Sequence, residues 1–437
     1  MRRRSVWLGV IGLSLAVLLT TAVGASARRT ADPKAVSGTL NITVGLTLKA
    51  SYEVIISNFE RVYPNVTVQP RYLQGGPVTA ATLGTQFQAG NAPDVVELPP
   101  GRVNIPSLLQ YAQAGYLADL SKRPWAKRLP PWMKPLVTLN GKVHGWGTGP
   151  TAGPAVVYNK DLLRQLGLTV PKTFAQLLNV CRTIRQKPGN LIPLGLIGSI
   201  ADADGAAALG IASSEVYGKD PNWNSKRARN KVTFQSTPGW RRSLQHIVDM
   251  KDAACFSPSV AADSIPTIVG QMATGRMVMM WFSDTGAGLL RAANPKLNLG
   301  IFVPPATTQA GTYMTVFPNN AELVNKKAQN MPAALAFVDF LAREKQDRLW
   351  AKIGGRVSAY DYQRAFNPKI GATALDAVHQ FAAPYAKAGK IRVTGQALWP
   401  STDPFEAIAR GVQGLLTGQK TVADVLKSAD DAWPKPK

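Results

Sequence analysis

The sequence predicts an α/β fold made of two lobes. Segments typical of strands alternate with segments typical of helices in both halves of the 437-residue chain, and such alternation builds sheets that are covered by helices. A chain of this length exceeds what one hydrophobic core usually serves, so two domains are expected. The segment from Gly147 to Pro154 is rich in Gly, Pro and Thr, which is typical of a crossing between domains.

The first half of the chain opens with a strand–helix–strand unit. Leu40 to Gly45 alternates and contains β-branched residues, which predicts a strand. Ser51 to Val62 has its apolar residues at helical spacing and ends before Pro64. Val66 to Tyr72 alternates again and predicts a second strand, parallel to the first. Further elements are expected as helices at 80–89 and 105–114 and as strands at 94–98, 142–146 and 155–159.

Helix start signals organise the second half. Thr173 stands three residues before Gln176, and Thr421 three residues before Asp424, as in capping boxes. Pro332 is expected in the first turn of another amphipathic helix. The remaining expected elements are a helix at 240–250 and strands at 194–197, 277–282 and 299–303.

The N-terminal residues have the pattern of a secretory signal. Arg2 to Arg4 precede an uncharged run from Ser5 to Ala25, and Ala25-Ser26-Ala27 offers a cleavage site. We therefore expect residues 1–27 to be a signal peptide and 28–37 a linker. The alternative is an uncleaved anchor, because the run is long enough to cross a bilayer. No cysteine lies near the cleavage point, so no lipobox is present and lipid attachment there is not expected.

The net charge is +24, and removing the three arginines of the leader leaves 24 − 3 = +21. A charge of this size fits a nucleic-acid, anionic-lipid or acidic-ligand partner, or simply a cationic surface. The Lys and Arg residues are dispersed and lack interleaved aromatic residues, which favours the cationic surface and no nucleic-acid partner. Three widely spaced histidines give no metal-ligand spacing, and no motif for a cofactor is present.

The chain has two cysteines, Cys181 and Cys255. In an oxidising compartment such a pair forms a disulfide, whereas the alternative is two buried free thiols. The disulfide is the favoured interpretation.

Aromatic residues near predicted strand ends and in loops suggest a ligand site. They are Trp146, Trp281, Trp399 and Phe405. Sugars have apolar C–H faces ringed by hydroxyls, so a sugar site combines flat aromatic walls with paired polar groups. Core packing is the competing interpretation for each of these rings. We interpret Glu97 and Asp284 as ordinary loop carboxylates. The alternative is that they form the acid/base pair of an enzyme.

Six segments, in order along the chain, resemble the extracellular solute-binding proteins of ABC transporters, in the carbohydrate-binding branch that contains maltose-binding protein. These segments are NFERVYPNV (58–66), GNAPDVVEL (90–98), GKVHGWGTGPTAGPAVVYNKDL (141–162), PKTF (171–174), GRMVMMWF (275–282) and LLTGQKTV (415–422). The resemblance implies a two-lobed periplasmic-binding-protein-like fold of type II, with one ligand in a cleft between lobes that close like a hinge. The expected lobes are 38–147 with 304–343, and 148–303 with 344–437, so that the chain crosses near 147–150 and near 303–306.

The resemblance also implies the function. It predicts a non-catalytic, exported and monomeric protein that binds a mono- or oligosaccharide without a cofactor and delivers it to permease subunits in the membrane. Two alternatives stay open. One is the same fold binding an anionic solute, such as a glycerol phosphate or an acidic sugar. The other is an extracellular carbohydrate-active enzyme.

The family motifs also indicate ligand contacts. Arg102 follows the GNAPDVVEL strand at a position where relatives contact the ligand, and Glu97 lies within that strand. Thr148 and Thr151 lie in the crossing, where carbohydrate binders often carry an acid that is missing here. The remaining candidates are Ser283, Asp284 and Thr285 after the GRMVMMWF strand, together with Phe405 and Trp399 near a C-terminal aromatic platform.

Overall fold

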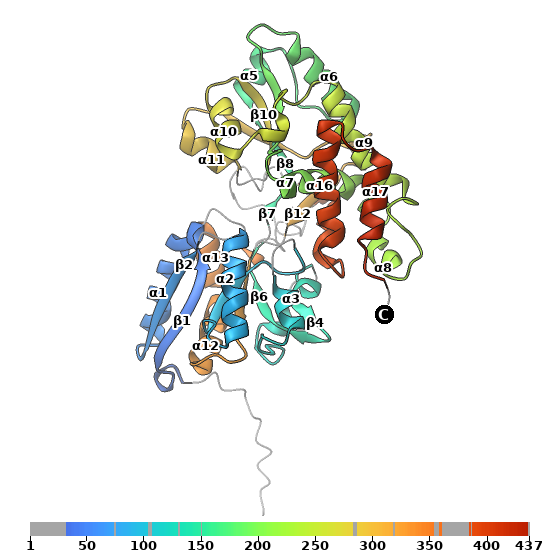
Figure 1. Ribbon diagram of the computed structural model, residues 1–437. Coiled ribbons are helices and arrows are strands. Elements are labelled where there is room, and N and C mark those ends of the chain that lie inside the picture. Colours follow the sequence, from blue (N-terminus) through green and yellow to red (C-terminus); the bar gives the residue numbers. More distant parts are fainter. Residues whose placement is uncertain are drawn as a thin grey trace, which may run out of the picture.

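The chain forms two lobes, one above the other in Figure 1, joined by thin connecting segments. The structure is a computed structural model. It describes residues 32–73, 76–103, 107–129, 132–149, 151–282, 286–317, 320–353, 358–360, 384–385 and 387–435. The expected signal peptide and residues 28–31 of the expected linker lie outside the described residues. The two-lobed α/β prediction is confirmed.

The first lobe is built on a five-stranded sheet with the order β2-β1-β3-β13-β6. β1 runs parallel to β2 and β3, as the strand–helix–strand pattern predicts, whereas β13 runs antiparallel to β3 and β6. β13 comes from far along the sequence, so the first lobe is discontinuous. The strands are β1 (Gly38–Gly45), β2 (Val66–Leu73), β3 (Val95–Leu98), β6 (Gly145–Gly147) and β13 (Ala321–Val324).

Helices pack on this sheet through apolar stripes. In α1 the buried residues recur at helical spacing, and Phe59 contacts Phe337 and Phe340 with ring centroids 5.2 and 5.5 Å apart. These contacts tie α1 to α12, a helix that follows β13 in the chain. The helices of this lobe are α1 (Lys49–Val62), α2 (Gly76–Ala89), α3 (Leu108–Gln113), α4 (Lys134–Val137), α12 (Met331–Leu341) and α13 (Glu344–Ile353).

The position of α13 corrects one expected lobe boundary. We expected the chain to leave the first lobe after Arg343, but α13 packs against α1. Trp350 is fully buried there, its carbonyl accepts a hydrogen bond of 3.0 Å from Ser51 Oγ, and its ring contacts that of Tyr52. Tyr360 also packs against this core. The burial of this large indole therefore keeps α13 in the first lobe, beyond the expected boundary.

The second lobe has a four-stranded sheet with the order β11-β8-β10-β9. β10 is antiparallel to β8 and parallel to β9. The strands are β8 (Ala155–Asn159), β9 (Ile192–Gly195), β10 (Met277–Phe282) and β11 (Leu299–Phe302). The helices are α5 (Lys160–Gln165), α6 (Phe174–Arg185), α7 (Ala201–Ala212), α8 (Trp223–Ala228), α9 (Pro238–Asp252), α10 (Ile265–Ala273), α11 (Gly286–Ala293), α16 (Asp403–Thr417) and α17 (Val422–Asp431).

A small third sheet lies between the lobes, with the order β14-β12-β7. It consists of β7 (Thr151–Ala152), β12 (Met314–Phe317) and β14 (Ile391–Val393), and Figure 1 shows β7 and β12 at the junction. Near the first expected crossing, Gly147 pairs with Ala321 of the first-lobe sheet and Thr151 pairs with Phe317 of the small sheet. The second expected crossing is placed too early. Residues 304–313 stay with the second lobe, because Ala306 accepts a hydrogen bond of 2.9 Å from Phe174 N and Tyr313 N donates one of 2.9 Å to Ser214 Oγ. The chain crosses after Phe317 instead.

The two cysteines are joined in the second lobe. Cys181 of α6 and Cys255, just after α9, form a disulfide with their Cα atoms 4.8 Å apart. Both are fully buried. The two cysteines are 74 residues apart in sequence, so the bond fixes the segment after α9 against α6.

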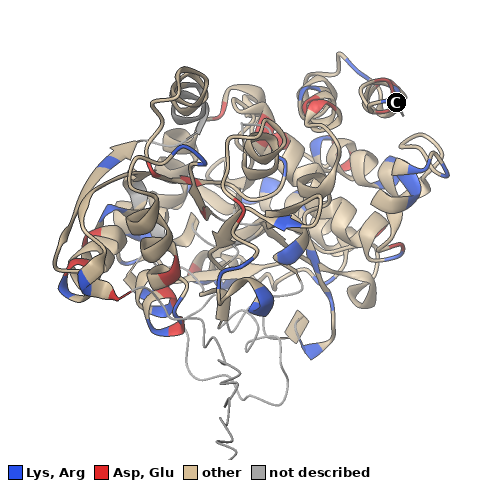
Figure 2. Ribbon diagram, turned by 90° about the horizontal axis from the view of Figure 1, so that it is seen from below, with Lys and Arg blue, Asp and Glu red and all other residues tan. Residues whose placement is uncertain are grey.

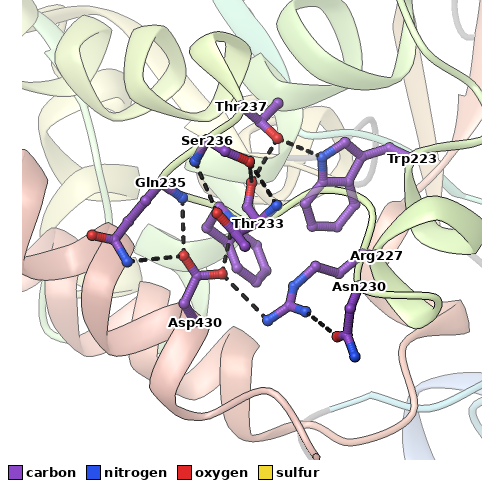
Figure 3. Close-up of polar contacts among 9 residues, drawn as sticks. Trp223, Arg227, Asn230, Thr233, Gln235, Ser236, Thr237 and Asp430 are labelled. Carbon is purple, nitrogen blue, oxygen red and sulfur yellow. Dashed lines mark hydrogen bonds and ion pairs between the residues drawn. The ribbon is translucent and has the colours of Figure 1, made fainter. Parts of the chain in front are cut away.

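A second tie holds the C-terminal helix. Asp430 of α17 accepts hydrogen bonds from Phe234 N (2.8 Å) and Gln235 N (3.0 Å) and pairs with Arg227 of α8 (3.3 Å), as Figure 3 shows. The Arg227 guanidinium also lies 4.8 Å from the centre of the Trp433 ring. Both charged side chains of this pair are about nine-tenths buried or more, so each depends on the other.

We expect Asp430→Ala to lower the free energy of unfolding by roughly 3–5 kcal/mol, because it leaves a buried guanidinium without its counter-charge. Asp431→Ala is the matched control. Its side chain is 62% exposed and pairs with Lys427 on the helix surface, so its loss should cost under about 1 kcal/mol. Urea unfolding of both variants measures the difference. Equal free energies of unfolding for Asp430→Ala and Asp431→Ala would contradict a stabilising role for the buried pair of Arg227 and Asp430.

Candidate functional site

The parallel strands of each lobe, β1 with β3 and β9 with β10, turn their carboxyl ends toward the junction. β1 and β3 end at Gly45 and Leu98, and the loop after β3 reaches the other side, where Arg102 N donates a hydrogen bond of 2.8 Å to the carbonyl of Ala397. In α/β sheets, ligands bind in the crevice outside the carboxyl ends of the strands. The junction is therefore the candidate site.

The second lobe contributes an apolar cavity of about 170 Å³. Trp281 and Phe282, at the end of β10, meet Phe317 of β12 there. The lining residues are Gly153, Pro154, Ile197, Ala203, Ala206, Trp281, Phe282 and Phe317. Within the described part of the chain, the Trp281 indole N–H has no hydrogen-bond partner. The cavity thus offers aromatic and aliphatic surface.

A larger cavity of about 300 Å³ lies in the first lobe, between α12 and the segment 123–128. Its lining includes no residue of the second lobe and none of the residues expected at the site. Although it is larger, we place the site at the junction, because a hinged protein binds between its lobes.

Arg102 lies at the junction as expected. Its Nη2 atom donates a hydrogen bond of 2.9 Å to Gln113 Oε1. Its Nη1 atom is buried and has no partner among the described residues. Burial lowers the pKa of Arg102 from the ordinary value of arginine. A guanidinium with one satisfied nitrogen and one without a partner is suited to donate a further hydrogen bond to an oxygen atom.

Glu97 and Thr148 are engaged with the protein itself. Glu97 is buried, with one carboxylate oxygen accepting a hydrogen bond of 2.6 Å from Gly45 N and the other accepting one from the Asn320 amide. Thr148 donates to the Asn320 carbonyl from both N (2.8 Å) and Oγ1 (3.0 Å). Neither side chain is therefore free to serve as a catalytic acid or base, or as an open ligand contact.

Trp146 does not line the apolar cavity. It is 1% exposed and packs in the first lobe with its ring centroid 5.6 Å from those of Trp125 and Tyr360. Trp146 is therefore a core residue of the first lobe, which was the competing interpretation of this residue.

Trp399 and Phe405 are also core residues rather than an open platform. Trp399 is 1% exposed and donates a hydrogen bond of 3.0 Å from Nε1 to Asn224 Oδ1. It lies in a nest of rings in the second lobe, formed by Tyr217, Trp223, Phe234, Trp240, Trp399 and Trp433. Phe405 is buried beside α7, where its ring lies close to Gly205. The six rings of this nest pack on one another and exclude water, so Trp399 contributes to the core of the second lobe and not to an open surface.

The remaining candidates are only partly described. Thr151 lies in β7, opposite Phe317, and its side chain is outside the description. Ser283, Asp284 and Thr285 lie outside the described residues altogether. Sequence reasoning missed Phe282 and Phe317. Phe282 closes the apolar run that ends at the predicted strand end, so that run was a usable signal, whereas the four-residue strand of Phe317 gave none.

The comparison with protein families decides the broad class. The model of the bacterial extracellular solute-binding protein family matches residues 45–348. The chain belongs to this family.

Known members of this solute-binding family support the same fold. The multiple sugar-binding protein of Streptococcus mutans is 25% identical over 359 residues, which are 80% of each chain. The structure superposes on the GacH receptor of Streptomyces glaucescens, solved unliganded and with acarbose, with a TM-score of 0.73 and 21% identity over 91% of this chain and 98% of that one. It also superposes on a sugar transporter from Bacillus licheniformis in complex with stachyose, with a TM-score of 0.68 and 19% identity over 91% and 99%.

Two features are absent from the residues that the structure describes. No helix among them is both long and apolar enough to cross a membrane. They also hold no group of three or more His, Cys, Asp or Glu side chains placed to bind a metal ion.

A buried carboxyl pair lies beside the junction of this solute-binding protein. Glu322 of β13 stands opposite Glu97 of β3 and is fully buried. The Tyr52 hydroxyl donates a hydrogen bond of 2.5 Å to its Oε1 atom. Burial, and secondly the negative charge of Glu97, raise the pKa of Glu322 well above its ordinary value. The buried site therefore favours the protonated form of Glu322 more than water does.

We expect the isosteric Glu322→Gln to become more stable relative to the native protein as pH rises above about 4.5. In the native protein the folded state holds a proton that the unfolded state releases above its ordinary pKa, so stability falls with rising pH until the folded pKa is reached. The difference should grow by up to about 1.4 kcal/mol per pH unit. Glu322→Asp keeps a carboxyl and should keep the pH dependence. Urea unfolding between pH 5 and about 8 measures both, and parallel curves for the native protein and Glu322→Gln would contradict this assignment.

Proposed function

We propose that this protein is the exported binding component of an ABC importer and that it carries a carbohydrate between its lobes. The observation that carries the proposal is the apolar cavity at the junction, walled by Trp281, Phe282 and Phe317. Membership of the extracellular solute-binding family supports it. The names of the relatives, a multiple sugar-binding protein and structures with acarbose and stachyose, support a saccharide as the solute.

The side chains that the two lobes contribute to the junction offer contacts that fit a sugar ring. Aromatic faces pack against the C–H face of a pyranose, which is the apolar part of the molecule. Across the junction, the free Nη1 of Arg102 is a donor suited to ring or hydroxyl oxygens. Asp284 stays a proposed partner from the second lobe, because it follows directly after β10 in the sequence.

An anionic solute is the second candidate, and Arg102 is the observation in its favour. The lining of the cavity argues against it, since the lining residues that the structure describes are apolar or aromatic and none of them carries a positive charge. In the view of Figure 2, Lys and Arg residues are spread over the molecule with Asp and Glu residues among them, which favours a generally cationic surface over a site for an anionic polymer. An enzyme is less favoured, because both oxygens of Glu97 are bonded to the protein.

We further propose that the protein acts as a monomer and meets permease subunits in the membrane. Export depends on the expected leader, residues 1–27, whether it is cleaved or kept as an anchor. Both cysteines of the chain are bonded to each other. Attachment to the membrane, if it occurs, therefore depends on the leader rather than on a lipid-modified thiol.

A thermal-shift screen with neutral oligosaccharides, acidic sugars and sugar phosphates identifies the solute class, and calorimetry then tests the site. With the saccharide found, Phe282→Ala should weaken binding roughly tenfold or more, because losing a buried aromatic face costs about 1.5 kcal/mol or more. Arg102→Ala should weaken it to a similar extent, because it removes a charged hydrogen bond.

Tyr116→Ala is the matched control, since this half-buried ring stacks on Phe87 away from the junction. It should bind like the native protein. A screen in which only sugar phosphates raise the melting temperature would reject the neutral saccharide. Native affinity in both Phe282→Ala and Arg102→Ala would reject the site.

A further inference from the structure

Glu97 connects two separate parts of the first lobe at its junction face. One carboxylate oxygen accepts the N–H of Gly45, the last residue of β1, at 2.6 Å. The loop that begins there, Leu46–Leu48, lies at the carboxyl end of the sheet. The other oxygen accepts a hydrogen bond from the side-chain amide of Asn320. A carboxylate has no donor, so both partners must donate to it, as they do here.

Asn320 in turn joins the two described passages between the lobes. It precedes β13 on the passage from β12, and its carbonyl accepts two hydrogen bonds from Thr148 on the passage from β6 to β7. On the second-lobe side, Thr151 pairs with Phe317. On the first-lobe side, Gly147 pairs with Ala321. The contacts between Asn320 and Thr148 thus lie between two short ladders, at the point where the chain passes from one lobe to the other.

We propose that Glu97 is a positioning residue that couples the ligand-facing end of the first lobe to the hinge. Its carboxylate accepts hydrogen bonds from the end of β1 and from the Asn320 amide, and this fixes their relative positions. The Asn320 carbonyl in turn accepts hydrogen bonds from Thr148. Rotation of the lobes must change backbone torsions in these passages. Because Glu97 is 7% exposed, water competes little for its two bonds, so the orientation of the lobes that satisfies both is favoured.

This inference rests on the proposed function only in that the lobes move relative to each other. It needs no ligand, so it is tested on the unliganded protein. The single disulfide uses both native cysteines, so introduced cysteines can be labelled selectively. The exposed residues Lys127, in the first lobe, and Lys296, in the second, are suitable label positions.

The test compares distance distributions between spin labels in Lys127→Cys/Lys296→Cys protein, with and without Glu97→Gln. Gln keeps the shape of the side chain but turns an NH₂ group toward a donor, so one of the two bonds is lost. We expect the interlobe distance distribution to shift or broaden. Glu60→Gln is the matched control, because Glu60 accepts a single backbone N–H, from Val68 at 2.8 Å, within the same lobe. It should leave the distribution as in the parent protein.

A purely structural role for Glu97 would lower the melting temperature without changing the distance distribution. That outcome, a distribution for Glu97→Gln identical to that of Glu60→Gln, would overturn the proposal. If Glu97→Gln does not fold, Asn320→Ala decides the question. It removes the amide that reaches Glu97 but keeps the carbonyl that binds Thr148, and the same shift or broadening is expected. An unchanged distribution in Asn320→Ala would equally overturn the proposal.

Discussion

The constraint on which the rest of the structure depends is that the chain passes repeatedly between two lobes. Each described passage has to satisfy its backbone hydrogen bonds in a thin segment without a large core of its own. The structure meets this need with short ladders, β7 with β12 and β6 with β13, and with Asn320 between them. The lobes can then be stable separately, and the junction can be left for a ligand.

Each lobe is stabilised by its own means. In the first lobe, Phe59 packs α1 against α12 and Trp350 packs α13 against α1, although both helices come much later in the chain. In the second, the disulfide, the buried pair of Arg227 with Asp430 and a nest of aromatic rings hold α6, α8, α9 and α17 together. Because the aromatic residues are used so heavily in these cores, few are left for the junction. Among the described residues, Trp281, which is 3% exposed and itself part of the second-lobe core, lines the junction cavity together with Phe282 and Phe317.

Periodicity in the sequence was sufficient for the long elements and for the fold class, since β1, α1, β2, β8 and β10 lie where their patterns predict them. It was not sufficient for β7, β12 and β14, because strands of two to four residues are formed by their neighbours and not by local preference. The motif around β3 predicted a position for Arg102 just after the strand, and the structure places its N–H against the carbonyl of Ala397, while its role in binding stays a prediction. Trp399 could not be assigned from the sequence, because a tryptophan that packs on other tryptophans and one that packs on a sugar have the same local pattern.

The central claim is that a saccharide binds at the junction, against the aromatic wall of the second lobe. The most direct test is a crystal structure of the protein with the oligosaccharide that gives the largest shift in melting temperature. The account predicts a sugar ring in contact with Trp281, Phe282 and Phe317, within reach of Arg102 from the other lobe. A sugar bound instead in the cavity between α12 and residues 123–128 would contradict it.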